Sequence, residues 1–226
     1  MGALNPKLNN LASRALKSVG MFDSFLLARR QRLVKRIQQE MDGKTFEYHG
    51  MHLPYTYHTY NSTYANERCV EVSIGKWFLE THEDVLEVGN VMNHYCDIPH
   101  EVVDKYEIAP GVRNEDVVSI KDHHKNILAI STLEHVGFDD GGQGKGDHTQ
   151  FFKAVENIKS IGQHALITLP WGVNPSVDKF VSEFTGAMTL YYRDGREWKQ
   201  GTLTDIREKT YGSKYSGANA IAVVEL

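Results

Sequence analysis

The stretch EDVLEVGNVMNHYCDIPHEVVDKYE, residues 83–107, decides which fold the sequence predicts. One apolar run ends at Gly89, and a second ends at Asp104, fifteen residues further on. This pattern predicts a buried strand, a turn and a second strand, and in open parallel sheets ligands bind beyond the carboxyl ends of such strands. The turn holds one glycine, whereas a loop around a pyrophosphate usually carries G-x-G-x-x-G. The sequence therefore disfavours a dinucleotide.

A nucleoside ligand without phosphates requires less of this turn. Gly89 lets the backbone approach a ligand closely, and Asn90 can adopt a positive φ at modest cost, which would replace a second glycine. The Asp104 carboxylate, at the end of the second strand, can accept hydrogen bonds from both hydroxyls of a ribose. The alternative is a buried strand and an ordinary turn that bind no ligand.

The rest of the chain continues the same alternation. Segments with helical spacing of apolar residues lie between some strands, most clearly residues 147–162. Strands that alternate with helices predict an α/β fold, with a mainly parallel sheet of about seven strands and helices on both faces. The predicted strands are residues 84–90, 100–106, 115–120, 126–132, 164–170, 188–194 and 220–226.

The first 60 residues have a different character. Apolar positions recur at helical spacing from Leu4 to about Met41, and six aromatic rings follow between Phe46 and Tyr64. We expect a helical and aromatic extension over residues 1–60 that packs on a core domain of residues 61–226. The aromatic segment can cover a cofactor cleft or stack on a sugar ring, or it can simply pack the extension against the core. The long helix can also pair two chains in a homo-oligomer.

Composition narrows the class of protein. The 226 residues are 41% hydrophobic, and no apolar run approaches the ~20 residues of a membrane-spanning helix. We see no secretory signal, and two cysteines are too few for a disulfide framework, so we expect a cytoplasmic protein. The net charge of −4 argues against a general nucleic-acid binder.

Three motifs together resemble class I S-adenosylmethionine-dependent methyltransferases. They are DVLEVGN at residues 84–90, the acidic strand end VVDKYE at 102–107, and ILAISTLEHVGFDD at 127–140. The segments NSTYANERCVEV and LPWGVNPSVD more specifically resemble methyltransferases from polysaccharide-modification genes. The resemblance covers about residues 61–226 and implies a Rossmann-like fold with S-adenosylmethionine as the cofactor and S-adenosylhomocysteine as its product.

The resemblance also implies roles for individual residues. Glu87, Gly89 and Asn90 would line the methionine and ribose side of the cofactor. Asp104 would bind the ribose, with Lys105 beside it. The segment beneath the sulfonium would be Ser131, Thr132 and Leu133. The adenine side departs from the family pattern, because VVSIKD offers Ser119 where an acidic residue is common, with Asp116 and Asp122 nearby.

Methyl transfer is an in-line displacement, and a hydroxyl acceptor additionally benefits from a base. His135 would lie near the transferred methyl group as the base or as an acceptor-orienting group, and Glu134 is placed similarly. His94 and Tyr95, directly after the first motif, are candidate substrate contacts. Trp171, in the loop after the fifth predicted strand, is a further one.

The segment 138–148, FDDGGQGKGDH, has the composition of a mobile substrate lid, and we expect no metal site there. The function predicted overall is O-methylation of a small polar acceptor, such as a sugar hydroxyl or a phosphate-linked group of a surface polysaccharide precursor. The alternatives are N-methylation of an amino sugar and a non-catalytic binding module with the same fold.

Overall fold

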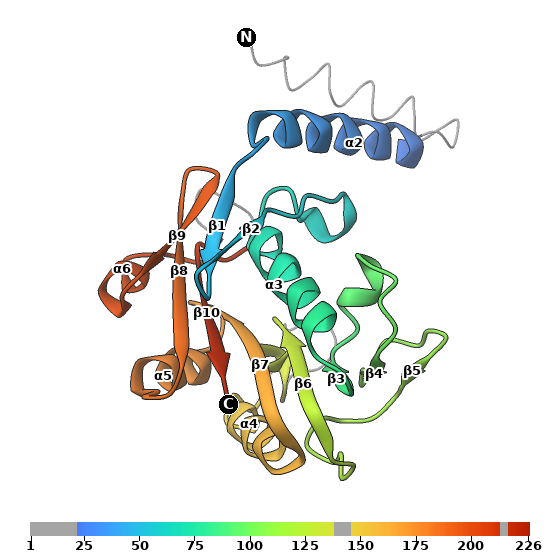
Figure 1. The fold of residues 1–226 in the computed structure, drawn as a ribbon, viewed down its shortest axis with the longest axis vertical. Coiled ribbons are helices and arrows are strands. Elements are labelled where there is room, and N and C mark those ends of the chain that lie inside the picture. The colour runs from blue at the N-terminus through green and yellow to red at the C-terminus, as the bar shows by residue number, and fades with distance from the viewer. Residues whose placement is uncertain (1–21, 138–145, 213–216) are drawn as a thin grey trace.

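An eight-stranded mixed sheet forms the centre of the computed structural model, which describes residues 22–137, 146–212 and 217–226 (Figure 1). In the order in which they lie side by side, the strands are β5 (Val112–Arg113), β4 (Glu101–Val103), β3 (Val85–Val88), β6 (His124–Ile130), β7 (Gly162–Pro170), β10 (Ala220–Glu225), β8 (Met188–Asp194) and β9 (Glu197–Gly201).

The strand order reverses at β3. From β3 the chain passes to β4 and β5 on one side, and then crosses back to β6 on the other side. The five strands from β5 to β7 are parallel, whereas β10 runs antiparallel between β7 and β8. The carboxyl ends of β3 and β6 therefore form a topological switch point, the place where open α/β sheets bind ligands.

Helices cover both faces of the sheet. Along β6, Ile127 and Ala129 point into the core beneath α4 (Gln150–Ile161), α5 (Pro175–Glu183) and α6 (Leu203–Arg207). Their neighbours Leu128 and Ile130 point into the opposite core, beneath α3 (Arg68–Thr81). Strand alternation thus builds two cores, and Figure 1 shows α3 and α4 on opposite sides of the sheet.

The described part of the predicted extension, residues 22–60, belongs to the α3 side, whereas residues 1–21 lie outside the described residues. Helix α2 (Phe22–Glu40) ends above a two-stranded hairpin, β1 (Thr45–Tyr48) and β2 (Met51–Pro54), as Figure 1 shows. The side chains of Ile37, Tyr48 and Tyr55 are buried in the same core as α3 and β10. A division between domains at residue 60 stays a prediction. The aromatic residues before it are shared core of the described protein.

Two strand predictions are corrected. Residues 115–120 form a turn, and the edge strand is the shorter β5 that precedes them. Val117 and Ile120 are buried, which accounts for the apolar pattern in the sequence. Their carbonyls accept hydrogen bonds from Asn157 Nδ2 and not from the backbone of a neighbouring strand among the described residues. The eighth strand, β9, is additional. It pairs with β8 across the two-residue turn Gly195–Arg196, whose first residue is a glycine with a positive φ of 65°.

Among the residues that the structure describes, no helix is both long enough and apolar enough to cross a membrane. The described residues also include three short 3₁₀ turns, η1 (Tyr60–Ser62), η2 (Met92–His94) and η3 (Leu133–His135).

Candidate functional site

A cavity of about 650 Å³ lies at the switch point. The loops after β3, β4 and β6 form its floor and sides, and the connection between β5 and β6 adds a further wall. Tyr60 and Asn61, from the aromatic segment that precedes α3, complete the lining. This volume is typical of cavities that enclose a small molecule.

Gly89 is required here by a neighbouring loop. Its φ is +89°, and a Cβ atom at this position would lie 2.2 Å from Thr132 Oγ1. The glycine therefore lets the loops after β3 and β6 pack against each other, so that its space is filled by Thr132 rather than by a ligand. Both residues line the cavity. Asn90 is not among the described residues with positive φ, which corrects the expectation that it replaces a second glycine.

Asp104 organises the wall after β4. Its Oδ2 accepts a hydrogen bond from Asn90 N (3.1 Å), and its Oδ1 accepts from Tyr106 N and Glu107 N (2.8 Å each). A carboxylate has about four acceptor sites, so roughly one remains for a ligand hydroxyl. Glu107 also lines the cavity, and its Oε1 accepts a hydrogen bond from Asn90 Nδ2 (2.7 Å).

Glu87, expected to line the cofactor site, lies beneath it instead. Its carboxylate is fully buried, and Oε1 accepts hydrogen bonds from the backbone N–H groups of Val91 and Met92. Its Oε2 pairs with His100 Nε2 at 2.8 Å. Burial alone would lower the pKa of His100, but the hydrogen bonds to Glu87 and to the Ile98 carbonyl outweigh this effect and raise it. Glu87 thus shapes the loop and does not line the cavity.

Lys105 and Asp116 lie together on the cavity wall formed by β4 and the β5–β6 connection. Lys105 Nζ is 2.8 Å from Asp116 Oδ2, which raises the pKa of the lysine. Val117 lines the cavity beside them. Glu115 and Asp116, and not Ser119, are therefore the polar residues that this connection presents to the cavity.

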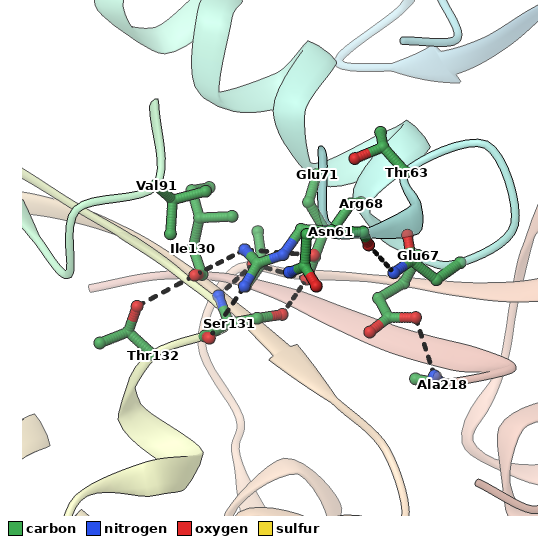
Figure 2. A network of polar contacts seen from close by, with 12 residues as sticks. Asn61, Thr63, Glu67, Arg68, Glu71, Val91, Ile130, Ser131, Thr132 and Ala218 are labelled. Carbon is green, nitrogen blue, oxygen red and sulfur yellow. Dashed lines mark hydrogen bonds and ion pairs between the residues drawn. The ribbon is translucent and has the colours of Figure 1, made fainter. Parts of the chain in front are cut away.

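A polar network joins α3 to the end of β6. Arg68 donates hydrogen bonds from Nη1 to the Ile130 carbonyl (2.9 Å) and from Nη2 to the Ser131 carbonyl (3.3 Å). Glu71 Oε1 accepts from the hydroxyls of Ser131 and Thr168. Figure 2 shows the Arg68 guanidinium facing the carbonyls of Ile130 and Ser131. The network holds Ser131 at a φ of 38°, a conformation that a non-glycine residue adopts only when its surroundings enforce it.

His135 and Glu134 lie in η3, and their side chains differ in exposure to solvent. The His135 side chain is 63% exposed and lines the 650 Å³ cavity. Partial desolvation by the cleft, followed by the charge of Arg68, lowers its pKa. The Glu134 side chain is only 2% exposed, and burial raises its pKa to about 8. His135 Nε2 and Glu134 Oε1 are 3.6 Å apart.

A second cavity, of about 260 Å³, adjoins the first. The two share four lining residues, Asn61, Arg68, Ser131 and His135. The second cavity also contacts Glu134 and Glu67, whose Oε2 accepts a hydrogen bond from Ala218 N at 2.8 Å. Burial, together with the charge of Glu71, raises the pKa of Glu67. Two buried carboxyl groups with raised pKa thus lie beside the larger cavity.

Of the remaining candidates, one lines the larger cavity, His94 lines a separate cavity of about 440 Å³, and two pack on the core. Tyr95 lines the larger cavity, and its hydroxyl lies 2.7 Å from Thr63 Oγ1. His94 stacks on Tyr60, with ring centroids 4.1 Å apart, but is outside the residues that line the larger cavity. Leu133 is fully buried against α4, and Trp171 packs on the same core, so neither is among the described residues that line the 650 Å³ or the 260 Å³ cavity.

Residues 138–145 of the expected lid lie outside the described residues. Among the described residues, no group of three or more His, Cys, Asp or Glu side chains could hold a metal ion.

Sequence reasoning missed Glu67, Arg68 and Glu71. They lie at or just before the start of α3 in the segment NERCVEV, where three charged residues interrupt a helix face that is otherwise buried. Charged side chains are rarely buried unless they are paired, so their position on the apolar face was the available signal.

No model of a known protein family and no curated protein matches the chain. Among solved structures, it is similar to a putative RNA methyltransferase from Pyrococcus horikoshii, with 9% identity, 87% of this chain and 94% of that chain covered, and a TM-score of 0.42. It is similar to the magnesium protoporphyrin IX methyltransferase of Synechocystis PCC 6803 with bound SAM, with 8% identity, 68% and 77% coverage and a TM-score of 0.39. It is also similar to the N-terminal domain of EvdMO1 in the presence of SAH and D-fucose, with 10% identity, 87% and 95% coverage and a TM-score of 0.34. All three TM-scores are below 0.5, so the functional proposal rests on the geometry of this chain.

Proposed function

We propose that the protein is an S-adenosylmethionine-dependent methyltransferase that transfers a methyl group to a hydroxyl of a small polar acceptor. The observation that carries this proposal is the 650 Å³ cavity at the switch point of the sheet. It is lined by Gly89, Asp104 and Thr132, which come from the three motifs on which the sequence resemblance rests. Three motifs that are distant in sequence thus converge on one cavity.

The lining suits a nucleoside better than a dinucleotide. One strand-end carboxylate, Asp104, has a free acceptor position for a ribose hydroxyl, and Glu107 beside it offers another. The apolar side chains of Val103, Val117 and Val136 line the cavity and can pack on a purine ring. The Gly89 turn packs against Thr132, and the N–H groups of the three residues that follow it already donate to Asp104 and Glu87, so they are not open to a pyrophosphate.

The bound cofactor would supply an electrophilic methyl group on its sulfonium, and the protein would hold the acceptor in line with it. His135 is the proposed base, because it lines both cavities and its lowered pKa keeps the imidazole neutral near pH 7. A positioned base contributes about 10²- to 10⁴-fold to such a reaction. Glu134 is the second candidate for this role.

The proposed acceptor is a sugar hydroxyl of a surface polysaccharide precursor, as the sequence resemblance implies. N-methylation of an amino sugar would use the same cavity and require less of a base. A non-catalytic module would retain the fold and bind neither cofactor nor acceptor productively.

Calorimetry with S-adenosylhomocysteine tests the proposal directly. We expect saturable binding to the wild-type chain. Asp104→Ala should weaken it about 10- to 100-fold, because one hydrogen bond to a charged group is worth about 1.5–3 kcal/mol. The matched surface control is Asp122→Ala, whose carboxylate pairs with Arg113 outside the cavity. Absence of binding at millimolar ligand to the folded wild type would overturn the proposed function.

A further inference from the structure

Two of the residues that line the 260 Å³ cavity carry a buried polar atom that no described residue satisfies. Glu134 Oε2 and Asn66 Oδ1 are buried and have no hydrogen-bond partner among the residues that the structure describes. The two residues line this cavity and are 3% and 7% exposed, respectively. Buried polar groups in folded proteins are almost always hydrogen-bonded, because an unpaired one costs free energy. A water molecule or a bound ligand in the cavity would supply the missing partners.

The charges around the cavity restrict the chemistry of such a ligand. Among its described lining residues, the permanent cation is Arg68, and its guanidinium already faces Glu71 and donates to two backbone carbonyls. Recognition of phosphate requires a cation or a cluster of free N–H donors. In this cavity the carboxyl groups of Glu67 and Glu134 line the wall where a phosphate would require such donors.

The two glutamates instead match an uncharged hydroxyl-bearing ligand. A carboxyl group that is protonated both donates and accepts a hydrogen bond, as a sugar hydroxyl does. Burial raises the pKa of both groups, so their protonated forms persist close to neutral pH. The remaining wall carries Tyr211, Val173 and Pro170, which can pack on the apolar face of a sugar ring.

We propose that the 260 Å³ cavity is the acceptor site, and that Glu67 and Glu134 select an uncharged hydroxylated acceptor and exclude a phosphorylated one. This inference rests on the proposed function, since the four lining residues that the two cavities share place the acceptor beside the cofactor cavity. It favours the sugar hydroxyl over the phosphate-linked group that the sequence left open. Glu67 and Glu134 are then residues that determine acceptor specificity.

Transfer of radiolabelled methyl groups from S-adenosylmethionine to D-glucose, D-glucose 6-phosphate and D-glucosamine tests this selection in the full-length chain. We expect kcat/KM for D-glucose to exceed that for D-glucose 6-phosphate at least about tenfold, which corresponds to one lost or repelled hydrogen-bonded contact. Glu67→Ala and Glu134→Ala should each raise the acceptor KM about tenfold. Glu67→Gln and Glu134→Gln should keep the acceptor KM near that of wild type, because an amide replaces a protonated carboxyl. Glu156→Gln, on the exposed face of α4, is the matched control.

Two results would overturn the inference. The first is transfer to D-glucose 6-phosphate at a rate equal to or above that to D-glucose, or transfer to D-glucosamine with none to D-glucose. The second is an unchanged acceptor KM in both alanine variants. A readout that does not depend on turnover is calorimetric titration of the S-adenosylhomocysteine-saturated protein with D-glucose and with D-glucose 6-phosphate, where tighter binding of the phosphorylated sugar would also contradict the inference. If S-adenosylhomocysteine itself does not bind, the proposed function fails. If S-adenosylhomocysteine binds normally to every variant but either of the two contradicting acceptor results is found, only the acceptor assignment is wrong.

Discussion

The two adjoining cavities are built in opposite ways. The larger one is formed by strand ends and turns, and its main carboxylate, Asp104, is held by three backbone N–H groups. The smaller one is formed by side chains from around the start of α3 and from η3, and it leaves Glu134 Oε2 without a partner among the described residues. Backbone geometry fixes the first cavity before any ligand arrives. The second retains uncompensated polar atoms that a water molecule, a ligand or a proton can satisfy.

Arg68 is common to both cavities, so its removal should have the largest effect. We expect Arg68→Ala to lower the free energy of unfolding by about 3–5 kcal/mol, because it leaves the buried Glu71 carboxylate unpaired. Urea unfolding measures this change. The double variant Arg68→Ala, Glu71→Gln should recover part of the loss, since it removes the unpaired charge. A single variant as stable as wild type would show that the network does not join the cavities.

His135→Gln should have the next largest effect, on rate rather than on stability. Its side chain is largely exposed and lines both cavities, so we expect kcat to fall about 100-fold with binding of S-adenosylhomocysteine unchanged. The pH profile identifies the base. If the base is His135, activity rises with an apparent pKa below 6.5, whereas a Glu134 base would place that limb near pH 8. A limb near pH 8 that persists in His135→Gln would transfer the role to Glu134.

The larger cavity was the more predictable of the two. Gly89, Asp104 and Thr132 lie at strand ends in contiguous motifs, and strand ends of a parallel sheet meet at one edge whatever the packing around them. Why Gly89 is required was not predictable, because its neighbour Thr132 comes from a different strand. The role of Glu87 was also missed. Its sequence position resembles that of a ligand contact, and only the fold shows the backbone N–H groups that occupy it.

The smaller cavity could not be predicted from local patterns. It forms where the start of α3, η3 and the segment before β10 meet, and these are separated by 60 to 150 residues of chain. Gly217 shows the difficulty, because a Cβ atom there would lie 2.3 Å from Glu67 Oε2. A long-range contact also explains why the strand predicted at residues 115–120 is wrong. The buried apolar residues of this segment lie in a turn that Asn157, about 40 residues away in sequence, holds by hydrogen bonds.

Gly89→Ala tests how far the larger cavity depends on its turn. The alanine would have to keep a φ of +89° and would clash with Thr132, so we expect cofactor affinity to fall about tenfold. The double variant Gly89→Ala, Thr132→Ala should regain part of that affinity, because it removes the clash but not the backbone strain. Calorimetry with S-adenosylhomocysteine measures both. Equal affinities for the two variants would mean that the contact between the loops is unimportant.

Glu134→Gln should have the smallest effect. The sign of the change in Tm should differ from that of a matching substitution in the larger cavity. Burial raises the pKa of Glu134 from 4.5 to about 8, so the folded chain binds its proton more tightly than the unfolded chain does. The stability that this proton contributes is present below pH 4.5 and is lost as the pH rises towards 8. The groups that face it are Arg68, Glu71, Glu67, His135 and Tyr211.

The glutamine variant has no carboxyl to titrate at this position. The difference between its Tm and that of wild type should therefore increase from about pH 5 to pH 8 and stay constant above pH 8. Each kcal/mol corresponds to about 2–4 °C for a chain of this size. Scanning calorimetry at both pH values measures the gain, with Glu156→Gln as the control. Because Asp104 is held by backbone N–H groups, Asp104→Asn should lose stability at both pH values instead of gaining it. A Tm difference for Glu134→Gln that is the same at pH 5 and pH 8 would show that this carboxyl is already satisfied, and the contrast between the cavities would disappear.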